Sequence, residues 1–326
     1  MTCNYGSEKA LIHEVVKGCP ELSLGFSKKG FVTFKARDVI ALNFRVESVF
    51  ARVQGLSLSR FKIVNESMSE VISFVSELIK QYPTSLVHVS PRERMDKDKI
   101  DSDLIQLSQK YQALFQDNMV NPETIIDLIM VEEDEIWVGM RKVMKEEHLI
   151  AGNRPEIELP VEAPSRAYLK IAEAFYLFRP SILPGETIME IGSAPGGASY
   201  YLLSQGYKVI GVDNAQMDEK VFHHPNFKLI KKVAGSVEAS DFSDKVKWLA
   251  MDINVKPEIA FIELKKILPH LPDLKGALLT LKMPKVDGYL EVPEYLKRLS
   301  KLGFKKLTPI QLFYNKQEVF IYAIKE

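Results

Sequence analysis

The hydrophobic pattern from about residue 157 onward alternates short apolar runs with longer amphipathic ones. The runs "TIMEIG", "KVIGVD", "KVKWLAMD" and "GALLTLK" predict buried strands, whereas "GGASYYLLSQG", "IAFIELKKILPHL" and "VPEYLKRLSKLG" predict helices. Strands that alternate with helices favour a parallel sheet. The final runs, "LTPIQLFY" and "EVFIYAIK", predict a hairpin that turns at Asn315 and Lys316. The predicted fold class is therefore α/β, a doubly wound, Rossmann-like sheet with an antiparallel edge hairpin.

The front of the chain has a different pattern. Residues 1–70 contain a helical stretch from Ser7 to Val16, the alternating strand "KGFVTFKA", another helix-like stretch and "SVFARVQGLSL", which together indicate a small α+β unit. The next segment has the helical run "MSEVISFVSELIKQY", a charged stretch, and "TIIDLIMVEEDEIWVGM", a predicted hairpin that turns at Glu132 to Glu135. Residues 151–165, rich in Pro, Gly and charge, predict a linker. We therefore expect three domains, at 1–70, 71–156 and 157–326.

Composition and charge narrow the class of protein. A chain of 326 residues that is 46% hydrophobic can bury more than one core. No apolar run reaches the roughly 20 residues that span a bilayer, and the N-terminus lacks a signal-peptide pattern, so we expect a cytoplasmic protein without a membrane segment. The zero net charge argues against a strongly basic nucleic-acid binder, although a basic face can be concealed in that average. Cys3 and Cys19 form no CxxC pair, and we expect reduced cysteines and no metal.

A glycine turn, "GSAPGG", follows the first predicted strand of the last domain. It differs from the dinucleotide fingerprint G-x-G-x-x-G because Ala194 and Pro195 stand where close approach of a pyrophosphate needs glycine. Asp213 ends the next predicted strand, where a carboxylate can accept hydrogen bonds from a ribose diol. S-adenosylmethionine and a nicotinamide dinucleotide both carry that ribose, and the turn favours S-adenosylmethionine. A third interpretation is that the glycines serve only the backbone conformation and close packing of the turn.

Ionisable residues end two further predicted strands. Asp252 follows "WLAM" and Lys282 follows "LLTL", while Lys170 begins a helix and Glu318 begins the last strand. The carboxyl ends of strands in a doubly wound sheet open into one crevice, so these four side chains are expected to converge. Methyl transfer to a hydroxyl needs a base, and a lysine becomes one when burial and a second ammonium lower its pKa from about 10.4. Taken singly, each residue is also consistent with an ordinary salt bridge.

The spaced set Lys170, Asp252, Lys282 and Glu318 around "GSAPGG" resembles the Lys-Asp-Lys-Glu tetrad of the FtsJ/RrmJ-like ribose 2′-O-methyltransferases. Within that family, "APSRAYLKIAEAF", "VDNAQM", "LKMP" and "QLFYNKQEV" are similar to the ribosomal large subunit methyltransferase M group, which modifies a cytidine ribose in 23S rRNA. "TCNYGSEKALIHEVV" and "GFVTFKA" resemble the ferredoxin-like unit of that group. "IIDLIMVEEDEIWVGM" resembles the end of a THUMP domain, an RNA-binding module.

The resemblance implies a role for each matching residue. Lys282 would be the proton acceptor and Lys170 its helper, and Asp252 and Glu318 would position them. The cofactor would be S-adenosyl-L-methionine and the partner ribosomal RNA, either 23S rRNA or a pre-ribosomal particle, with no metal and a plausible monomer. The implied cofactor-binding residues are Ala167, Gly192, Ala194, Pro195, Gly196, Gly197, Asp213, Val233 and Asp252.

Three features depart from the family pattern. Ala198 follows the glycines where the group has a bulky aromatic residue, Val233 and Ala234 stand where an acid would hold adenine, and the front is less basic than an rRNA-binding module. Candidate RNA contacts are "KLIKK", "DKVKW" and Arg166, although such clusters are often only solvated surface. Two alternative functions are an RNA-binding or ribosome-assembly factor with a methyltransferase fold and a nicotinamide-dependent oxidoreductase. The complete tetrad and the missing glycine favour the methyltransferase over both.

Overall fold

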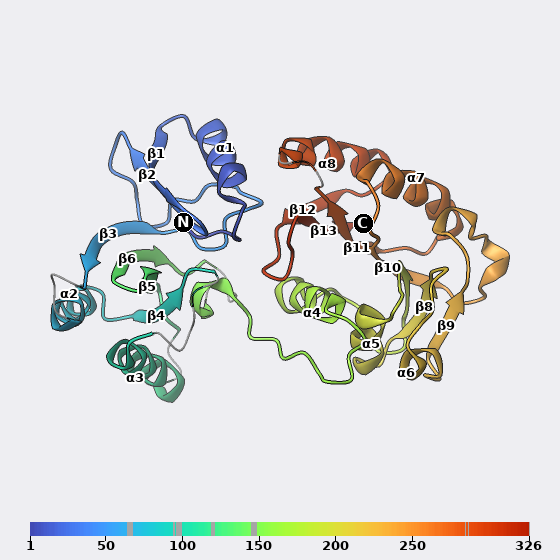
Figure 1. Cartoon of the computed structure of the whole chain (residues 1–326), viewed down its shortest axis with the longest axis horizontal. Helices are drawn as coiled ribbons and strands as arrows, with labels where there is room; N and C mark the ends of the chain where they lie inside the picture. Colours follow the sequence, from blue (N-terminus) through green and yellow to red (C-terminus); the bar gives the residue numbers. More distant parts are fainter. Residues whose placement is uncertain are drawn as a thin grey trace. The chain divides into compact units, whose positions relative to one another are not determined.

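The computed structural model describes residues 1–63, 68–93, 95, 100–118, 121–144, 149–283, 285 and 287–325. These residues divide into two compact units, Met1–Arg154 and Pro155–Glu326 (Figure 1). Within the predicted linker, residues 151–153 form a short 3-10 helix, η3 (Ala151–Asn153), and residues 154–165 form neither helix nor strand. The predicted charged stretch at 90–103 lies partly outside the described residues.

The first unit contains a four-stranded sheet and a separate hairpin. The sheet has the order β3-β6-β5-β4, with only β4 and β5 parallel. Apolar side chains of two helices, among them Val71 and Leu104, pack with the sheet in one core. The elements of this unit are α1 (Glu8–Gly18), β1 (Leu22–Lys28), β2 (Phe31–Ala36), β3 (Leu56–Lys62), α2 (Met68–Gln81), β4 (Ser85–Pro91), α3 (Ser102–Asn118), β5 (Thr124–Glu132) and β6 (Glu135–Lys142).

The predictions for this unit succeeded where the hydrophobic period was strong. The helix at 68–82 is α2, and the hairpin at 124–140 is β5 and β6. The prediction of a helix after residue 36 was wrong, since residues 37–50 form bends, turns and irregular backbone. There Arg45 donates to the carbonyl of Phe44 and Gln54 bonds both backbone groups of Val46, so side chains occupy groups that a helix would use.

The domain names given to the front of the chain stay predictions. Strand β3 belongs to the range 1–70, yet it pairs with β6 from the range 71–156, from Leu56 opposite Met140 to Lys62 opposite Glu135. The hairpin of β1 and β2 forms a sheet of its own. The two ranges therefore share one sheet in the structure.

The second unit is built on a seven-stranded sheet in the order β12-β13-β11-β10-β7-β8-β9 (Figure 1). Every strand runs parallel to the others except β13, which lies between β11 and β12. This confirms the predicted α/β class with its antiparallel hairpin. The predicted turn at Asn315 and Lys316 was too short, because β12 ends at Ile310 and the Asn315 side chain binds the Leu312 N–H within a loop of residues 311–317. The strands are β7 (Thr187–Ile191), β8 (Lys208–Val212), β9 (Phe227–Ile230), β10 (Val246–Asp252), β11 (Gly276–Lys282), β12 (Lys306–Ile310) and β13 (Glu318–Ile324).

Helices bury the faces of this sheet, which explains its continuous apolar strands. All five residues of β7 are buried, as expected for a parallel strand covered on both faces. Trp248 is 2% exposed and stacks on Tyr322, so it is a core residue. The helices are α4 (Ala167–Phe178), α5 (Gly197–Ser204), α6 (Glu219–Phe222), α7 (Pro257–Ile267) and α8 (Val292–Lys301), with short 3-10 turns η4 (Ala234–Ser236), η5 (Ala239–Asp241), η6 (Leu268–His270) and η7 (Gly288–Glu291).

The order of the strands places the candidate site. The chain runs outward from β7 in one direction through β8 and β9 and in the other through β10 and β11, so the crevice of the sheet lies between β7 and β10. Gly192, Asp213, Asp252 and Lys282 all lie at the carboxyl ends of their strands. No helix within the described part of the chain is long and apolar enough to cross a membrane.

Candidate active site

Four ionisable side chains form a closed ring at the carboxyl ends of β10 and β11. Lys170 Nζ lies 2.9 Å from Asp252 Oδ2 and 2.8 Å from Glu318 Oε2. Lys282 Nζ lies 3.4 Å from Asp252 Oδ1 and donates a hydrogen bond to Glu318 Oε1. Each ammonium therefore contacts both carboxylates, and each carboxylate offers one oxygen to each lysine. We call these four residues the lysine–carboxylate ring.

Three strand ends and one helix position this ring. Asp252 and Lys282 are the last residues of adjacent parallel strands. Glu318 is the first residue of the antiparallel strand β13 and lies directly opposite Lys282 in the register. Lys170 reaches the same edge from the first turns of α4. The reversed direction of β13 is what brings its first residue to the carboxyl ends of the other strands.

The ring is mostly buried, but each of its side chains keeps some contact with solvent. Its side chains are 10–21% exposed. Burial lowers the pKa of Lys282, but the hydrogen bond to Glu318 and the charge of Asp252 outweigh this, so its pKa is raised. The lowered pKa expected from the sequence was wrong, because the two carboxylates outweigh burial. Burial raises the pKa of Glu318, but Lys170 and Lys282 outweigh it and lower that pKa.

The glycines of "GSAPGG" are required by close packing. A Cβ atom on Gly192 would lie 2.8 Å from the carbonyl oxygen of Asp252, and one on Gly197 would lie 2.6 Å from that of Ser165. Gly196 has a φ of +118°, which side chains rarely adopt. The turn therefore brings the end of β7 against a member of the ring. These contacts account for the glycines without a ligand, so support for a cofactor rests on other groups.

Asp213 follows β8, contacts this turn and has capacity for a ligand. Its Oδ2 accepts from the backbone N–H of Ala194 at 3.0 Å, and its Oδ1 accepts from that of Ala215 at 2.8 Å. The peptide bond between Ala194 and Pro195 is cis. An ionised carboxylate has about four acceptor positions, so these two bonds orient Asp213 and leave positions for hydroxyl donors.

The remaining predicted residues lie around this edge of the sheet. Ala167 begins α4, and its N–H donates to Ser165 Oγ. Val233 precedes η4 in the segment after β9 and is 53% exposed. Ala198, the small residue in place of an aromatic one, is buried in the core that α5 shares with β7.

Two of the predicted RNA-contacting lysines pair with acidic side chains. Lys232 pairs with Asp241 at 2.6 Å, and Lys247 pairs with Asp273 at 3.3 Å. Arg166 is exposed immediately before α4. The structure thus leaves Arg166 with more capacity for a phosphate than the two paired lysines.

Sequence reasoning missed two buried carboxylates beside the site. Glu190, in the middle of "TIMEIG", accepts a hydrogen bond from Ser199 of α5, and burial raises its pKa to about 8. Glu173, on α4, accepts hydrogen bonds from the backbone N–H groups of Phe313 and Tyr314. An acidic residue inside an otherwise apolar run was the available signal for Glu190.

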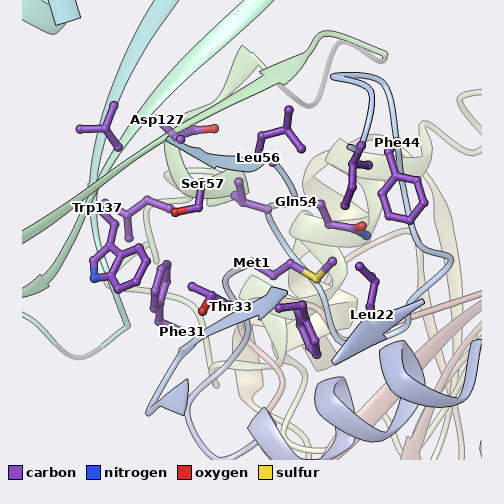
Figure 2. Close-up of a pocket in the computed structure, with 17 residues that line it drawn as sticks. Met1, Leu22, Phe31, Thr33, Phe44, Gln54, Leu56, Ser57, Asp127 and Trp137 are labelled. Atoms are coloured by element: carbon purple, nitrogen blue, oxygen red, sulfur yellow. The ribbon is translucent and has the colours of Figure 1, made fainter. Parts of the chain in front are cut away.

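The first unit contains a cavity of a different character. Figure 2 shows Phe31, Phe44 and Trp137 around it, with Asp127 on its border. Asp127 is held by Arg141 and His88 within the same unit. The residues that line the cavity include no member of the predicted site, and aromatic and aliphatic surface dominates it. The predicted site residues therefore lie in the second unit and not in this cavity.

Comparison with known proteins finds a family model that matches most of the second unit. The model of the family "FtsJ-like methyltransferase" matches residues 163–300. The second unit, Pro155–Glu326, is thus similar to FtsJ-like methyltransferases over residues 163–300, and we call it the FtsJ-like domain. That match spans α4, the glycine turn, Asp252 and Lys282 of the ring, and it ends before Glu318. It confirms the predictions of a methyltransferase, of S-adenosylmethionine as cofactor and of a Rossmann-like sheet.

The similarity to individual proteins extends beyond the FtsJ-like domain. The chain is 24% identical to the protein named "Ribosomal RNA large subunit methyltransferase M" of Tolumonas auensis, over 99% of this chain and 95% of that protein. It is 25% identical to the Shewanella sp. protein of the same name, over 98% of this chain and 95% of that protein. The Ectopseudomonas mendocina protein of that name is 30% identical over 51% of this chain and 49% of its own length. The first two alignments include the front unit as well as the FtsJ-like domain.

Proposed function

We propose that this protein transfers the methyl group of S-adenosylmethionine to a ribose 2′-hydroxyl of large-subunit ribosomal RNA, a cytidine of 23S rRNA by the family resemblance. The observation that carries the proposal is the lysine–carboxylate ring at the crevice of the sheet. Two ammonium groups share two carboxylates there, so a proton can be held and released without a metal-ligand set. Relatives named as ribosomal RNA methyltransferases that align over nearly the whole chain support the substrate class.

Residues of the glycine turn and its neighbours would hold the cofactor. The chemistry of Asp213 fits a ribose diol, because two backbone N–H groups orient its carboxylate and acceptor positions remain. The turn residues Gly192 to Gly197 would lie beside it, with Ala167 toward the methionine end and Val233 toward adenine. Asp252 joins the two parts of the site, because its carbonyl abuts Gly192 and its carboxylate belongs to the ring. When bound, S-adenosylmethionine supplies a methyl group on a positively charged sulfur.

Lys282 Nζ would accept the proton of the 2′-hydroxyl. It must first lose its own proton, which the raised pKa opposes. Loss of one proton leaves the ring with a net charge of −1, a state that a nearby positive charge stabilises. Lys170 would hold Asp252 and Glu318 in place during this change, since it contacts the carboxylate oxygens that Lys282 does not use. The bond formed joins the ribose oxygen to the methyl carbon, and the bond broken joins that carbon to sulfur.

The front unit would bind the RNA. We propose that residues 1–70 and 71–156 act as the ferredoxin-like and THUMP-like parts of this unit. Both are covered by the alignments to the relatives from Tolumonas auensis and Shewanella sp..

The proposal is tested by mapping ribose 2′-O-methylation across 23S rRNA from cells with and without this protein. We expect one methylated ribose to be lost without it and restored when the protein is supplied again. The purified protein should then methylate that ribose with S-adenosylmethionine, either on protein-free rRNA or on a pre-ribosomal particle. An unchanged ribose map, or methylation of a base instead of a ribose, would refute the proposed reaction.

A further inference from the structure

A loop between β12 and β13 is tied to the same helix that carries Lys170. Glu173 lies one turn after Lys170 on α4 and is 2% exposed. Its Oε1 accepts the backbone N–H of Phe313 at 2.7 Å, and its Oε2 accepts that of Tyr314 at 3.0 Å. A carboxylate is costly to bury, so its position on two backbone donors fixes this loop relative to the Lys170 helix.

The same loop ends at the ring. Asn315 is 4% exposed; its Oδ1 accepts the N–H of Leu312 at 2.9 Å, and its Nδ2 donates to Glu318 Oε2 at 3.0 Å. Gln311 closes the loop from the other side by donating to the carbonyl of Lys316 at 3.0 Å. Glu318 Oε2 is therefore held by Asn315 and Lys170 together, while Oε1 faces Lys282.

We propose that Glu173 and Asn315 are positioning residues for methyl transfer. Glu173 fixes the loop of residues 311–317 to α4. Asn315 belongs to that loop, and its hydrogen bond holds the carboxylate of Glu318 in place. This inference rests on the proposed function, because Glu318 matters to it as a member of the reacting ring. Neither residue belongs to the tetrad, and Glu173 acts through the backbone of the loop.

A positioning role has a consequence that a stabilising role lacks. The hydrogen bond to Glu318 is the largest influence that raises the pKa of Lys282. When Glu318 is no longer held, that bond weakens, so Lys282 should lose its proton at lower pH. The maximal rate should nevertheless fall, because a base displaced by about 1 Å can cost up to about 100-fold. The pH midpoint and the maximal rate therefore move together, and loss of fold alone moves neither per folded molecule.

The test measures kcat, the KM for RNA, the Kd for S-adenosylmethionine and the pH–rate profile of the full-length Glu173→Gln and Asn315→Ala variants. Glutamine keeps one acceptor oxygen but turns an NH2 group toward the second backbone N–H, so one of two bonds is lost. For both variants we expect kcat to fall about 10- to 100-fold and the pH midpoint to move to lower pH, with KM and Kd within about 3-fold.

Glu186→Gln is the matched control. Glu186 also accepts a backbone N–H, from Leu183 at 3.1 Å, together with Lys275 Nζ at 2.9 Å, and it stands before β7 at the opposite end of the sheet from the ring. This control should change thermal stability while leaving kcat and the pH midpoint of folded protein unchanged.

The outcomes separate the inference from the function on which it rests. Wild-type protein that methylates no rRNA ribose overturns the proposed function and the inference with it. Active wild type, with variants whose kcat and pH midpoint match those of Glu186→Gln, overturns the inference alone. Should Glu173→Gln not fold, Asn315→Ala decides, because it leaves the bonds between the loop and α4 in place.

Discussion

Two clusters of charged side chains, one in each unit, show how similar groups serve different purposes. In the first unit, Arg141 Nε lies 2.6 Å from Asp127 Oδ2, and His88 Nδ1 lies 3.7 Å from Asp127 Oδ1. These three residues, the Asp127 cluster, are 0–3% exposed. In the FtsJ-like domain, the lysine–carboxylate ring keeps 10–21% of each side chain exposed at the crevice.

The two clusters differ in their exposure to solvent and in whether one of their groups can give up or accept a proton. Burial alone would raise the pKa of Asp127, but the charge of Arg141 and the hydrogen bonds of His88 and Arg141 lower it to about 2. Asp127 is thus fixed as a carboxylate, and it is only 3% exposed although it borders the apolar cavity. The ring contains two lysines that contact the same two carboxylates from an open edge. A sealed cluster stabilises one arrangement of the fold, whereas an open one can exchange a proton with a bound molecule.

The largest effect that we expect is on the open cluster. Lys282→Met keeps the apolar stem and removes the ammonium, so it deletes the proposed base with little loss of packing. We expect methyl transfer to 23S rRNA to fall about 10⁴-fold, with the Kd for S-adenosylmethionine changed less than about 3-fold. Single-turnover transfer and calorimetric titration measure the two quantities.

Lys285→Met is the control for this variant. The Lys285 side chain is 73% exposed and pairs with Glu291 at 2.9 Å, so its loss should leave the rate within about 2-fold of wild type. A Lys282→Met protein that retains wild-type activity would show that the ring is a second structural cluster, and the contrast between the two units would disappear.

The next largest effect concerns the sealed cluster. Arg141→Met leaves Asp127 buried without its guanidinium, and we expect the first unit to lose about 3–4 kcal/mol of stability. Hydrogen exchange of β5 amides reports on this unit by itself. The double variant Asp127→Leu with Arg141→Met should recover most of that loss, because it removes both charges.

Arg60→Met supplies the exposed comparison in the same sheet. Arg60 pairs with Glu135 at 3.0 Å, but its own side chain is 46% exposed and the buried Glu135 keeps Lys62 at 2.8 Å, so its removal should cost less than about 1 kcal/mol. Equal losses for Arg141→Met and Arg60→Met would mean that burial of the Asp127 cluster contributes nothing.

The sequence predicts the ring well because parallel strands collect their carboxyl ends. Asp252 and Lys282 could be placed from strand ends alone, and the terminal hairpin adds Glu318. Glu173 could not be placed in this way. Its partner Phe313 lies 140 residues away, and the bond goes to a backbone N–H that any residue but proline supplies.

The Asp127 cluster was missed for a different reason. Asp127 lies opposite Gly139 in the hairpin, so Arg141, two residues further on, projects from the same face. The available signal was an acidic residue, Asp127, inside one apolar strand and a basic residue, Arg141, inside the next. The helix-like stretch after residue 36 failed because hydrophobic spacing says nothing of side chains that bind the backbone, as Arg45 and Gln54 do.

The smallest effect is a pH dependence that belongs to the sealed cluster. The pKa of Asp127 is lowered to about 2 in the folded protein from 3.8, so its contribution is complete above 3.8 and is lost as pH falls toward 2. A shift of this size corresponds to about 2 kcal/mol. Stability of the first unit, measured by β5 hydrogen exchange between pH 5 and pH 2, should therefore fall by about that much more in wild type than in the Asp127→Leu, Arg141→Met double variant. Lys282→Met should follow the wild-type curve, because its ring belongs to the other unit. Parallel curves for wild type and the double variant would show that Asp127 is not held as a carboxylate, and the sealed cluster would then differ from the ring in burial alone.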